Sequence, residues 1–288
     1  MKISKGEKIF QFINVVFLVL LSLVIIYPVV YTISASFSSS DAVVTGKVFL
    51  WPVDFDLAAY KHIFSDKTIW VAYLNSIFYT VVGTVMSLVL TICGAYPLSK
   101  PRLRGRGWIT FCIALTLWFS AGMIPMYLNM RNLGLLDSRL SILLHGTIST
   151  YNFVLMKNFF QSIPASLEEA AHIDGANDMQ ILFRIFIPLS LPSIATIALF
   201  YAVGRWNEYL WPMILVQKDN MLPLQVVLKK MIVDLNVDLT KGVDVDTKLS
   251  EETFVYATIV VSSVPMLCLY PFIQKYFVKG VMVGSIKG

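Results

Sequence analysis

Long uncharged apolar runs constrain this chain more than any other feature. A helix that crosses a bilayer needs about 20 mostly apolar residues, because the hydrocarbon core is about 30 Å thick and each residue adds about 1.5 Å. Six runs approach or exceed that length, at residues 12–35, 70–97, 108–128, 140–156, 188–216 and 254–277. We therefore predict an all-α integral membrane protein, with six transmembrane helices in a single domain over residues 1–288.

The composition excludes a soluble or disordered chain. Hydrophobic residues make up 57% of the sequence and charged residues only 14%, against about 25% charged in ordinary soluble domains. The first apolar run follows three lysines, as a secretory signal does, but a signal core has only about 7–15 apolar residues. The run at 12–35 is therefore predicted to be a retained membrane anchor.

The basic residues predict the orientation in the cell membrane. They gather in the amino-terminal tail, in the loop at 98–107 and near the carboxyl terminus, and cytoplasmic segments carry such an excess. Six spans put these three segments on one side, so both termini are predicted to be cytoplasmic and segments 36–69 and 217–253 external. The net charge of +5 reflects this topology, and we predict no nucleic-acid partner.

The cytoplasmic loop at 161–187 is predicted to contain two short helices. Ser166 is a good N-cap, and Glu169 three residues later completes a capping box. Gly175 would then end the first helix, because glycine accepts the left-handed conformation that other residues resist. Asn177 and Gln180 repeat the cap pattern before a second helix that leads into the fifth span.

The charge of this loop favours a protein partner over the membrane surface. An amphipathic hairpin on the inner leaflet is the alternative, but such helices usually carry Lys and Arg on the polar face. Here Arg184 alone opposes four acidic residues, which are Glu168, Glu169, Asp174 and Asp178. Because the inner leaflet is itself negative, an acidic loop is disfavoured there.

A known family has this loop pattern. The residues Glu169-Ala170-Ala171, then Gly175, then Ile187-Pro188 resemble the EAA loop of binding-protein-dependent ABC importer permeases. The departure from the pattern is Ile187 in place of leucine, which conserves side-chain volume. The string at 168–176 resembles the carbohydrate-type, MalG-like branch, and the sequences at 99–105 and 206–212 also resemble sugar permeases. Residues 222–225 resemble subgroups that import oligosaccharides from polysaccharide breakdown.

The resemblance implies a fold, a function and partners. The fold would be that of MetI-like permeases, and the chain would be one permease subunit of an ATP-driven carbohydrate importer. It implies a heterodimer with a second homologous permease, two cytoplasmic ABC ATPase subunits that bind ATP and Mg, an extracytoplasmic solute-binding protein and surrounding membrane lipid. The residues implied to couple to the ATPases are Glu168, Glu169, Ala170, Ala171, Asp174, Gly175 and Ala176.

Polar residues inside the fifth run are candidates for the substrate path. Ionisable groups at bilayer depth usually face a cavity or a partner, and Arg205 and Glu208 lie three residues apart on one helix face. They are either a self-neutralising pair or sugar contacts. The candidate path residues, including aromatic residues that could stack on sugars, are Arg205, Trp206, Asn207, Glu208, Tyr209, Trp211 and Asn152.

Catalytic and cofactor motifs are absent from the sequence. Without a G-x-x-x-x-G-K-[ST] motif the chain has no P-loop, so we predict no enzyme activity, no cofactor and no metal in this chain. The cysteines Cys93, Cys112 and Cys268 are predicted to be buried thiols. Two alternatives remain: a secondary transporter or channel driven by an ion gradient, and a receptor-like membrane protein. Neither explains the EAA loop.

Overall fold

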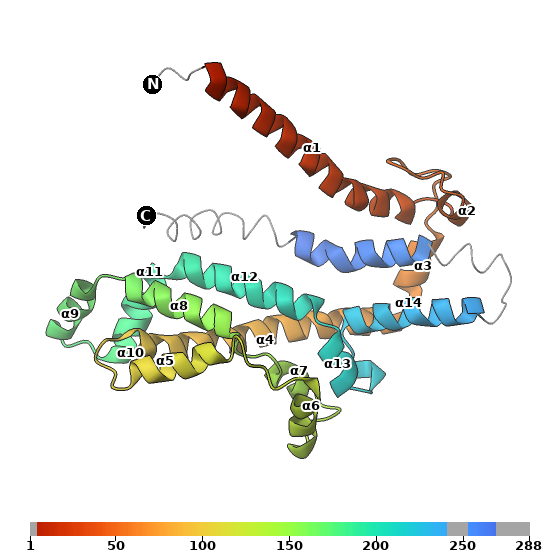
Figure 1. Ribbon diagram of the computed structural model, residues 1–288. Coiled ribbons are helices and arrows are strands. Elements are labelled where there is room, and N and C mark those ends of the chain that lie inside the picture. Colours follow the sequence, from red (N-terminus) through yellow and green to blue (C-terminus); the bar gives the residue numbers. More distant parts are fainter. Residues whose placement is uncertain (1–4, 241–252, 269–288) are drawn as a thin grey trace. The chain divides into compact units, whose positions relative to one another are not determined.

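The regular structure is helical throughout the residues described in the computed structural model, 5–240 and 253–268 (Figure 1). The elements are α1 (Lys5–Ser36), α2 (Ser40–Val44), α3 (Ala58–Ser65), α4 (Lys67–Ser99), α5 (Arg106–Leu115), α6 (Met123–Asn132), α7 (Arg139–Leu144), α8 (Thr150–Ser162), α9 (Ala165–Ile173), α10 (Asp178–Ile181), the π-helix η1 (Leu182–Phe186), α11 (Ile187–Leu189), α12 (Leu191–Asn207), α13 (Leu210–Leu215), the 3-10 helix η2 (Asp219–Met221), α14 (Leu224–Thr240) and a helix at Thr253–Cys268. The all-α prediction is confirmed.

The chain divides into two compact units. The first takes in residues 1–67 and 230–264, and the second residues 68–229 and 265–288. In the first unit, the segment after α1 folds back, and the Ser34 hydroxyl donates a hydrogen bond to the Leu50 carbonyl over 2.7 Å. Ala35, Ala42 and Val43 form a small core there.

The core of the second unit lies where α4, α8, α12 and η1 meet. Its largest buried side chains include Met156 and Phe160 of α8, Ile197 of α12 and Phe186 of η1. Close approach of α4 to α8 depends on Gly94, because a Cβ atom there would lie 2.7 Å from the Phe153 ring. These helices position both candidate sites described below.

Two helices among the described residues are long and apolar enough to cross a bilayer. They are the stretch Gly6–Ser36 of α1 and the whole of α4. A third span results if Asp178–Leu189 and Leu191–Asn207 are counted together, although these helices meet at 81°. The membrane-protein class follows, while the number of six spans does not follow from helix length.

Positive-φ glycines account for breaks in two predicted spans. The run predicted at 108–128 is divided between α5 and α6, and Gly122 directly before α6 has φ of 86°. The run predicted at 140–156 is divided between α7 and α8, with φ of 61° at Gly146. Since only glycine adopts such angles at little cost, the chain leaves the helical conformation at both places.

The predicted external loop at 217–253 begins with an ordered segment. The Asn75 side chain on α4 donates hydrogen bonds to the carbonyls of Asn220 and Leu222, over 2.9 and 3.1 Å. The Tyr79 hydroxyl donates to the Met221 carbonyl over 2.8 Å. The segment is therefore fixed to α4 before α14 begins, and residues 241–252 of the predicted loop lie outside the described residues.

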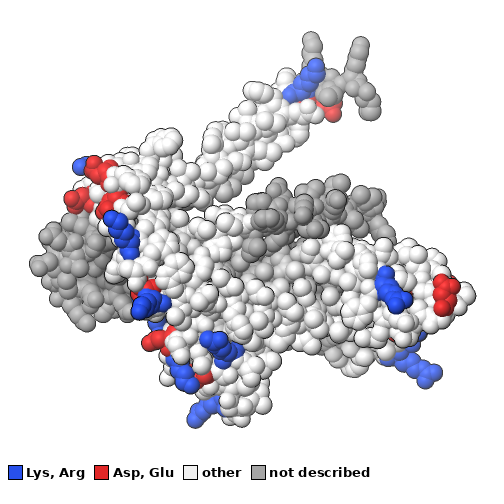
Figure 2. Space-filling view, turned by 180° about the vertical axis from the view of Figure 1, so that it is seen from behind, with Lys and Arg blue, Asp and Glu red and all other residues white. Residues whose placement is uncertain are grey.

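The surface suits a membrane protein. Figure 2 shows one face on which charged side chains are few and broad areas carry no charge. The most apolar stretch of α1 has none of its residues buried in this chain, as expected for a helix surrounded by lipid or a partner.

The prediction of buried cysteines was wrong, because Cys93, Cys112 and Cys268 are all exposed in this chain. An apolar run in a membrane protein can face lipid as well as a core.

Candidate functional site

The predicted coupling loop folds as two helices around a glycine turn. Gly175 has φ of 81°, its N–H donates to the His172 carbonyl, and the N–H of Ala176 donates to the Ala171 carbonyl. This pair of hydrogen bonds is the Schellman arrangement that ends a helix. The turn predicted at Gly175 is therefore present, and α10 follows it directly.

One of the two predicted capping boxes forms. Asn177 and Gln180 exchange both hydrogen bonds, so the prediction for the second helix is confirmed. The prediction for Ser166 and Glu169 was wrong. Pro164 takes the N-cap position with no side-chain hydrogen bond, so Ser166 lies inside the first turn of α9. Proline pre-sets a φ close to the helical value, which moves the start of the helix two residues earlier.

The residues of α9 divide between two faces. Ala171 is buried and Glu168 is half-buried, and these positions, three residues apart, lie on one face. Glu169 and Ala170 are exposed, and Ile173 is 87% exposed. Of the other predicted coupling residues, Asp174 and Gly175 are exposed and Ala176 is half-buried. The predicted coupling set is therefore split between a face that packs on this chain and a face that is open.

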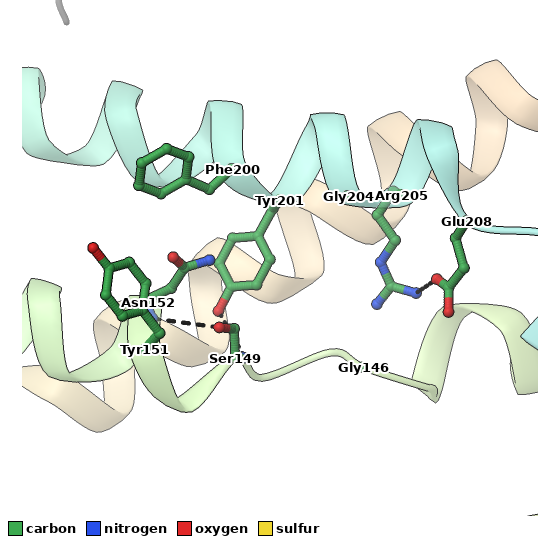
Figure 3. Close-up of a pocket in the computed structure, with 9 residues that line it drawn as sticks. All are labelled: Gly146, Ser149, Tyr151, Asn152, Phe200, Tyr201, Gly204, Arg205 and Glu208. Atoms are coloured by element: carbon green, nitrogen blue, oxygen red, sulfur yellow. Dashed lines mark hydrogen bonds and ion pairs between the residues drawn. The ribbon is translucent and has the colours of Figure 1, made fainter. Parts of the chain in front are cut away.

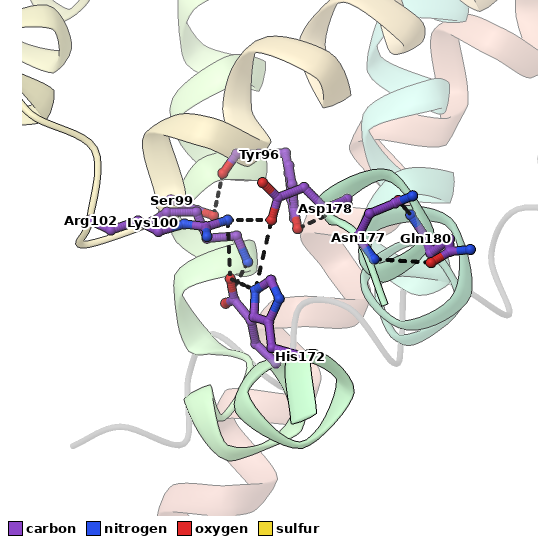
Figure 4. A network of polar contacts seen from close by, with 9 residues as sticks. Tyr96, Ser99, Lys100, Arg102, His172, Asn177, Asp178 and Gln180 are labelled. Carbon is purple, nitrogen blue, oxygen red and sulfur yellow. Dashed lines mark hydrogen bonds and ion pairs between the residues drawn. The ribbon is translucent and has the colours of Figure 1, made fainter. Parts of the chain in front are cut away.

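A network of ion pairs holds the inner face (Figure 4). Lys100 Nζ lies 2.7 Å from Glu168 Oε2, and Arg102 pairs with Asp178. His172 Nε2 lies 3.9 Å from Glu168 Oε1 and 3.8 Å from Asp178 Oδ1. The basic turn after α4 is thus joined to α9 and to α10.

Lys100 is unusual among the basic residues of this turn because it is buried. Its residue surface is 4% exposed, and its ammonium lies 3.5 Å from the centre of the Phe186 ring and 4.3 Å from that of Tyr96. Burial lowers the pKa of Lys100, and the hydrogen bond to Glu168 offsets part of that shift. Arg102 is exposed, and its hydrogen bond to Asp178 raises the pKa of its guanidinium. The sequence identified these bases only as a topology signal.

The same cluster contains ligand types for a metal ion. Glu168, His172 and Asp178 bring one ligand atom each within 4.8 Å of the others. Both carboxylates already pair with cations, namely Lys100 and Arg102, so two negative charges are balanced by two positive charges. A divalent cation would have to displace these partners, and the arrangement is better described as an ion-pair network.

The second candidate site is a cavity of about 400 Å³ beside α12 (Figure 3). Its lining combines aromatic rings, hydroxyl and amide groups and one ion pair, and consists of Gly146, Ser149, Tyr151, Asn152, Phe200, Tyr201, Gly204, Arg205 and Glu208. The Tyr201 hydroxyl bonds Thr91 of α4 at 2.8 Å and accepts from the Ser149 N–H at 3.1 Å. Apolar walls with a few convergent polar groups are typical of small-molecule sites.

The Arg205 guanidinium donates hydrogen bonds to the backbone of α7. Nη1 donates to the Ile142 carbonyl over 2.7 Å and Nη2 to the Leu143 carbonyl over 3.0 Å. These carbonyls belong to the last turn of α7, where helical partners run out. Glu208 Oε2 lies 3.9 Å from Nη1, and Glu208 Oε1 lies 3.1 Å from His145 Nδ1. The sequence identified the Arg205–Glu208 pair but not the α7 carbonyls or His145.

The structure separates the predicted path residues. Arg205, Glu208 and Asn152 line the cavity. The other four predicted residues do not line it. Trp206 is buried against Tyr73, and the Asn207 side chain donates to the Val203 carbonyl of its own helix. Tyr209 is exposed, and the Trp211 ring packs on His145. Tyr201 was missed, although its place one helical turn before Arg205 is a signal that sequence spacing could have supplied.

Comparisons with known proteins agree with these features. Over residues 68–283 the chain matches the family described as "Binding-protein-dependent transport system inner membrane component". It is 42% identical to the polygalacturonan/rhamnogalacturonan transport system permease protein YtcP of Bacillus subtilis, across 98% of this chain and 99% of that protein. It is 26% identical to the arabinooligosaccharides transport system permease protein AraQ of Halalkalibacterium halodurans, across 93% of each.

A solved structure is also similar. It belongs to a bacterial ABC transporter involved in the import of the acidic polysaccharide alginate, with 50% identity and a TM-score of 0.88 over 96% of this chain and 99% of that one. The family match covers more than half of this chain, and the resemblance predicted from the EAA loop is confirmed. The chain therefore belongs to the family of inner-membrane permease components of binding-protein-dependent ABC transport systems.

Proposed function

We propose that this permease imports acidic oligosaccharides released from a polysaccharide. The relatives named above carry the proposal: one is named for polygalacturonan, a polymer of a sugar acid, and one structure for the acidic polysaccharide alginate. Both are related to this chain over almost all of its length. Family membership also favours an ATP-driven system over the alternative of an ion-gradient transporter. In an ATP-driven system, separate subunits bind ATP and Mg.

The topology in this proposal keeps six spans, with both termini in the cytoplasm. Predicted spans that are interrupted, such as 108–128, would cross as bent or broken helices, which are tolerated where neighbouring protein or a cavity satisfies the freed backbone groups. Single-cysteine labelling with an impermeant reagent tests this arrangement. Arg104→Cys should react only in opened cells and Asp54→Cys in intact cells. Labelling of position 104 from outside would contradict the topology.

The open face of α9 is the proposed contact with the ATPase subunits. The observation that supports this assignment is that Glu169, Ala170 and Ile173 are exposed while the opposite face of α9 is held by this chain's own residues. An exposed apolar side chain beside an acidic one on a cytoplasmic helix suits a protein groove. The remaining partners in the proposal are a second, similar permease and an extracytoplasmic solute-binding protein.

The cavity beside α12 is the proposed part of the substrate path in this chain. Tyr151 and Phe200 offer ring faces to sugar C–H groups, and Asn152 and Ser149 offer hydrogen bonds to hydroxyls. Arg205 is already bonded to two carbonyls, so we assign it the support of the cavity and not the binding of the substrate. This choice favours the structural alternative for Arg205.

The proposal is tested by measuring sugar uptake in a strain that lacks this gene and in the same strain with the gene restored. The restored strain should accumulate oligogalacturonate or oligoalginate in an ATP-dependent manner, and should not accumulate a neutral maltooligosaccharide of equal length. Equal uptake of the neutral sugar would contradict the acidic substrate class.

The Glu169→Lys variant tests the ATPase contact. It should reach normal membrane levels but stop uptake, because it reverses a charge on the open face of α9. Normal uptake in this variant would contradict the ATPase contact.

A further inference from the structure

We infer that Lys100 is the positioning residue that transmits movement of α9 to α4, so that ATP hydrolysis and transport stay coupled through two helices. The inference rests on the proposed function of α9 as the ATPase contact. It concerns the Lys100 cluster, which we define as Lys100, Glu168, Tyr96 and Phe186.

The first observation is how little else attaches α9. Ala171 is its only buried residue, and Glu168 is its only half-buried one. An alanine buries too little apolar surface to fix a helix of nine residues. Glu168 attaches α9 to the turn after α4 through Lys100 at 2.7 Å and, more distantly, through the exposed Arg102 at 3.9 Å, so the Lys100–Glu168 contact is the closer and more buried attachment.

The second observation is where Lys100 lies. It directly follows the last residue of α4, and its ammonium contacts a carboxylate of α9 and the ring of Phe186 at the end of η1. Three elements therefore meet at one charged atom. A displacement of Glu168 must move Lys100 with it or break a 2.7 Å contact that is shielded from water.

The third observation is the contrast with the outer ion pairs. The side chains of Arg102 and Asp178 are 55% and 54% exposed, whereas those of Lys100 and Glu168 are 5% and 18% exposed. Exposed pairs contribute little because water and salt screen them. A buried charge is costly to separate from its partner, so this contact favours one geometry strongly over others.

Without this contact, the turn at the carboxyl end of α9 would let the helix move separately. At its carboxyl end lies Gly175, around which no atom would meet an added Cβ within 4 Å. The force of ATPase closure would then rotate α9 about the turn and leave α4 behind. The expected consequence is ATP hydrolysis without matching transport, not loss of ATPase binding.

The experiment uses the whole importer in proteoliposomes. Transport per ATP is measured with Ala170 intact, and a cysteine-free permease that carries Ala170→Cys on the open face of α9 serves only for the spin label and the crosslink. Lys100→Met keeps a long side chain and removes the charge, and Arg104→Met is the matched control from the same basic turn. Arg104 is exposed and outside the Lys100 cluster. Glu168→Gln is the milder second variant, since its amide oxygen can still accept from Lys100.

Two readouts are compared. In Lys100→Met the oligosaccharide transported per ATP should fall about tenfold, within the usual range of coupling energies. A spin label at position 170 should become more mobile, whereas Arg104→Met should change the transport ratio less than about twofold. Glu168→Gln should lie between them. An unchanged ratio or an unchanged spin-label mobility in Lys100→Met would overturn the inference.

Crosslinking separates this inference from the function on which it rests. The thiol introduced by Ala170→Cys should crosslink to an ATPase subunit whether Lys100 is present or replaced by methionine. If the parent with Lys100 does not crosslink, the proposed ATPase contact of α9 fails. If it does crosslink while the transport ratio of Lys100→Met equals that of the parent, the contact stands and the role of Lys100 is refuted.

Discussion

Two buried cations in this chain are stabilised in different ways. Lys100, beside α9, has a carboxylate at 2.7 Å and two aromatic faces. Arg205, in α12, has two backbone carbonyls at 2.7 and 3.0 Å, and its nearest carboxylate is 3.9 Å away. The first cation is neutralised by an opposite charge, and the second is solvated mainly by helix-end dipoles.

The difference follows from the chemistry of the two side chains. A guanidinium is a planar fork whose parallel N–H groups match two neighbouring carbonyls, whereas an ammonium is a compact charge that suits a carboxylate and ring faces. Carbonyls of a last helical turn are fixed in place, so Arg205 joins α12 to α7 as a structural unit. The Lys100–Glu168 pair joins α9 to the turn after α4 through two side chains, without fixed backbone carbonyls.

The largest expected effect is at Arg205. Arg205→Met should destabilise the second unit by about 2–5 kcal/mol, because it leaves two α7 carbonyls without their donor. Thermal unfolding of the purified importer measures this loss. Asn207→Ala, two residues further along α12, should change the unfolding free energy by less than about 0.5 kcal/mol. A small effect at Arg205 would mean that water, and not the α7 carbonyls, solvates its guanidinium, which would remove the contrast with Lys100.

A substitution at Gly94 tests how closely α4 and α8 pack against each other. Gly94→Ala places a methyl group 2.7 Å from Phe153 and should cost about 1–3 kcal/mol through overpacking. Phe153→Leu in the same chain should recover part of the loss. Gly107→Ala, where an added Cβ meets nothing within 4 Å, is the matched control. If Gly94→Ala is as stable as the control, α4 and α8 are less closely packed than described.

The smallest expected effect is in the coupling loop, at the caps. Asn177→Ala removes a capping box and should cost about 1 kcal/mol. Ser166→Ala should be nearly neutral, because Ser166 lies inside α9 and makes no cap hydrogen bond. Hydrogen exchange is measured at the amides that each cap would protect, 166–169 for Ser166→Ala and 177–181 for Asn177→Ala. Equal protection losses would show that Ser166 also caps a helix.

These cases show how much could be predicted from the sequence. The family, the all-α class, the turn at Gly175 and the cap at Asn177 depend on local patterns, and all were predicted correctly. The cap at Ser166 failed because Pro164 competes for the helix start. A side chain suited to capping was therefore not enough to predict where α9 begins.

The partners of the buried cations could not be predicted in the same way. Lys100 is one of four bases in a short turn, and the ring that covers it belongs to Phe186, far along the chain. Arg205 binds α7 carbonyls more than sixty residues earlier. Which base becomes buried depends on how distant helices pack, and the sequence shows only that bases are present.

The bend of 81° at Ser190 determines what kind of motion reaches the membrane. The arm from Asp178 to Leu189 has 12 residues, so it extends about 18 Å, almost at a right angle to α12. A sideways push on the outer end of such an arm exerts a torque about the long axis of α12, whereas a collinear helix would only be driven along that axis. A displacement of about 3 Å at the tip would turn α12 by about 10°, from the arm length set by helix rise. A twist of that kind would sweep Tyr201 and Arg205 around the axis of α12 without moving them along it.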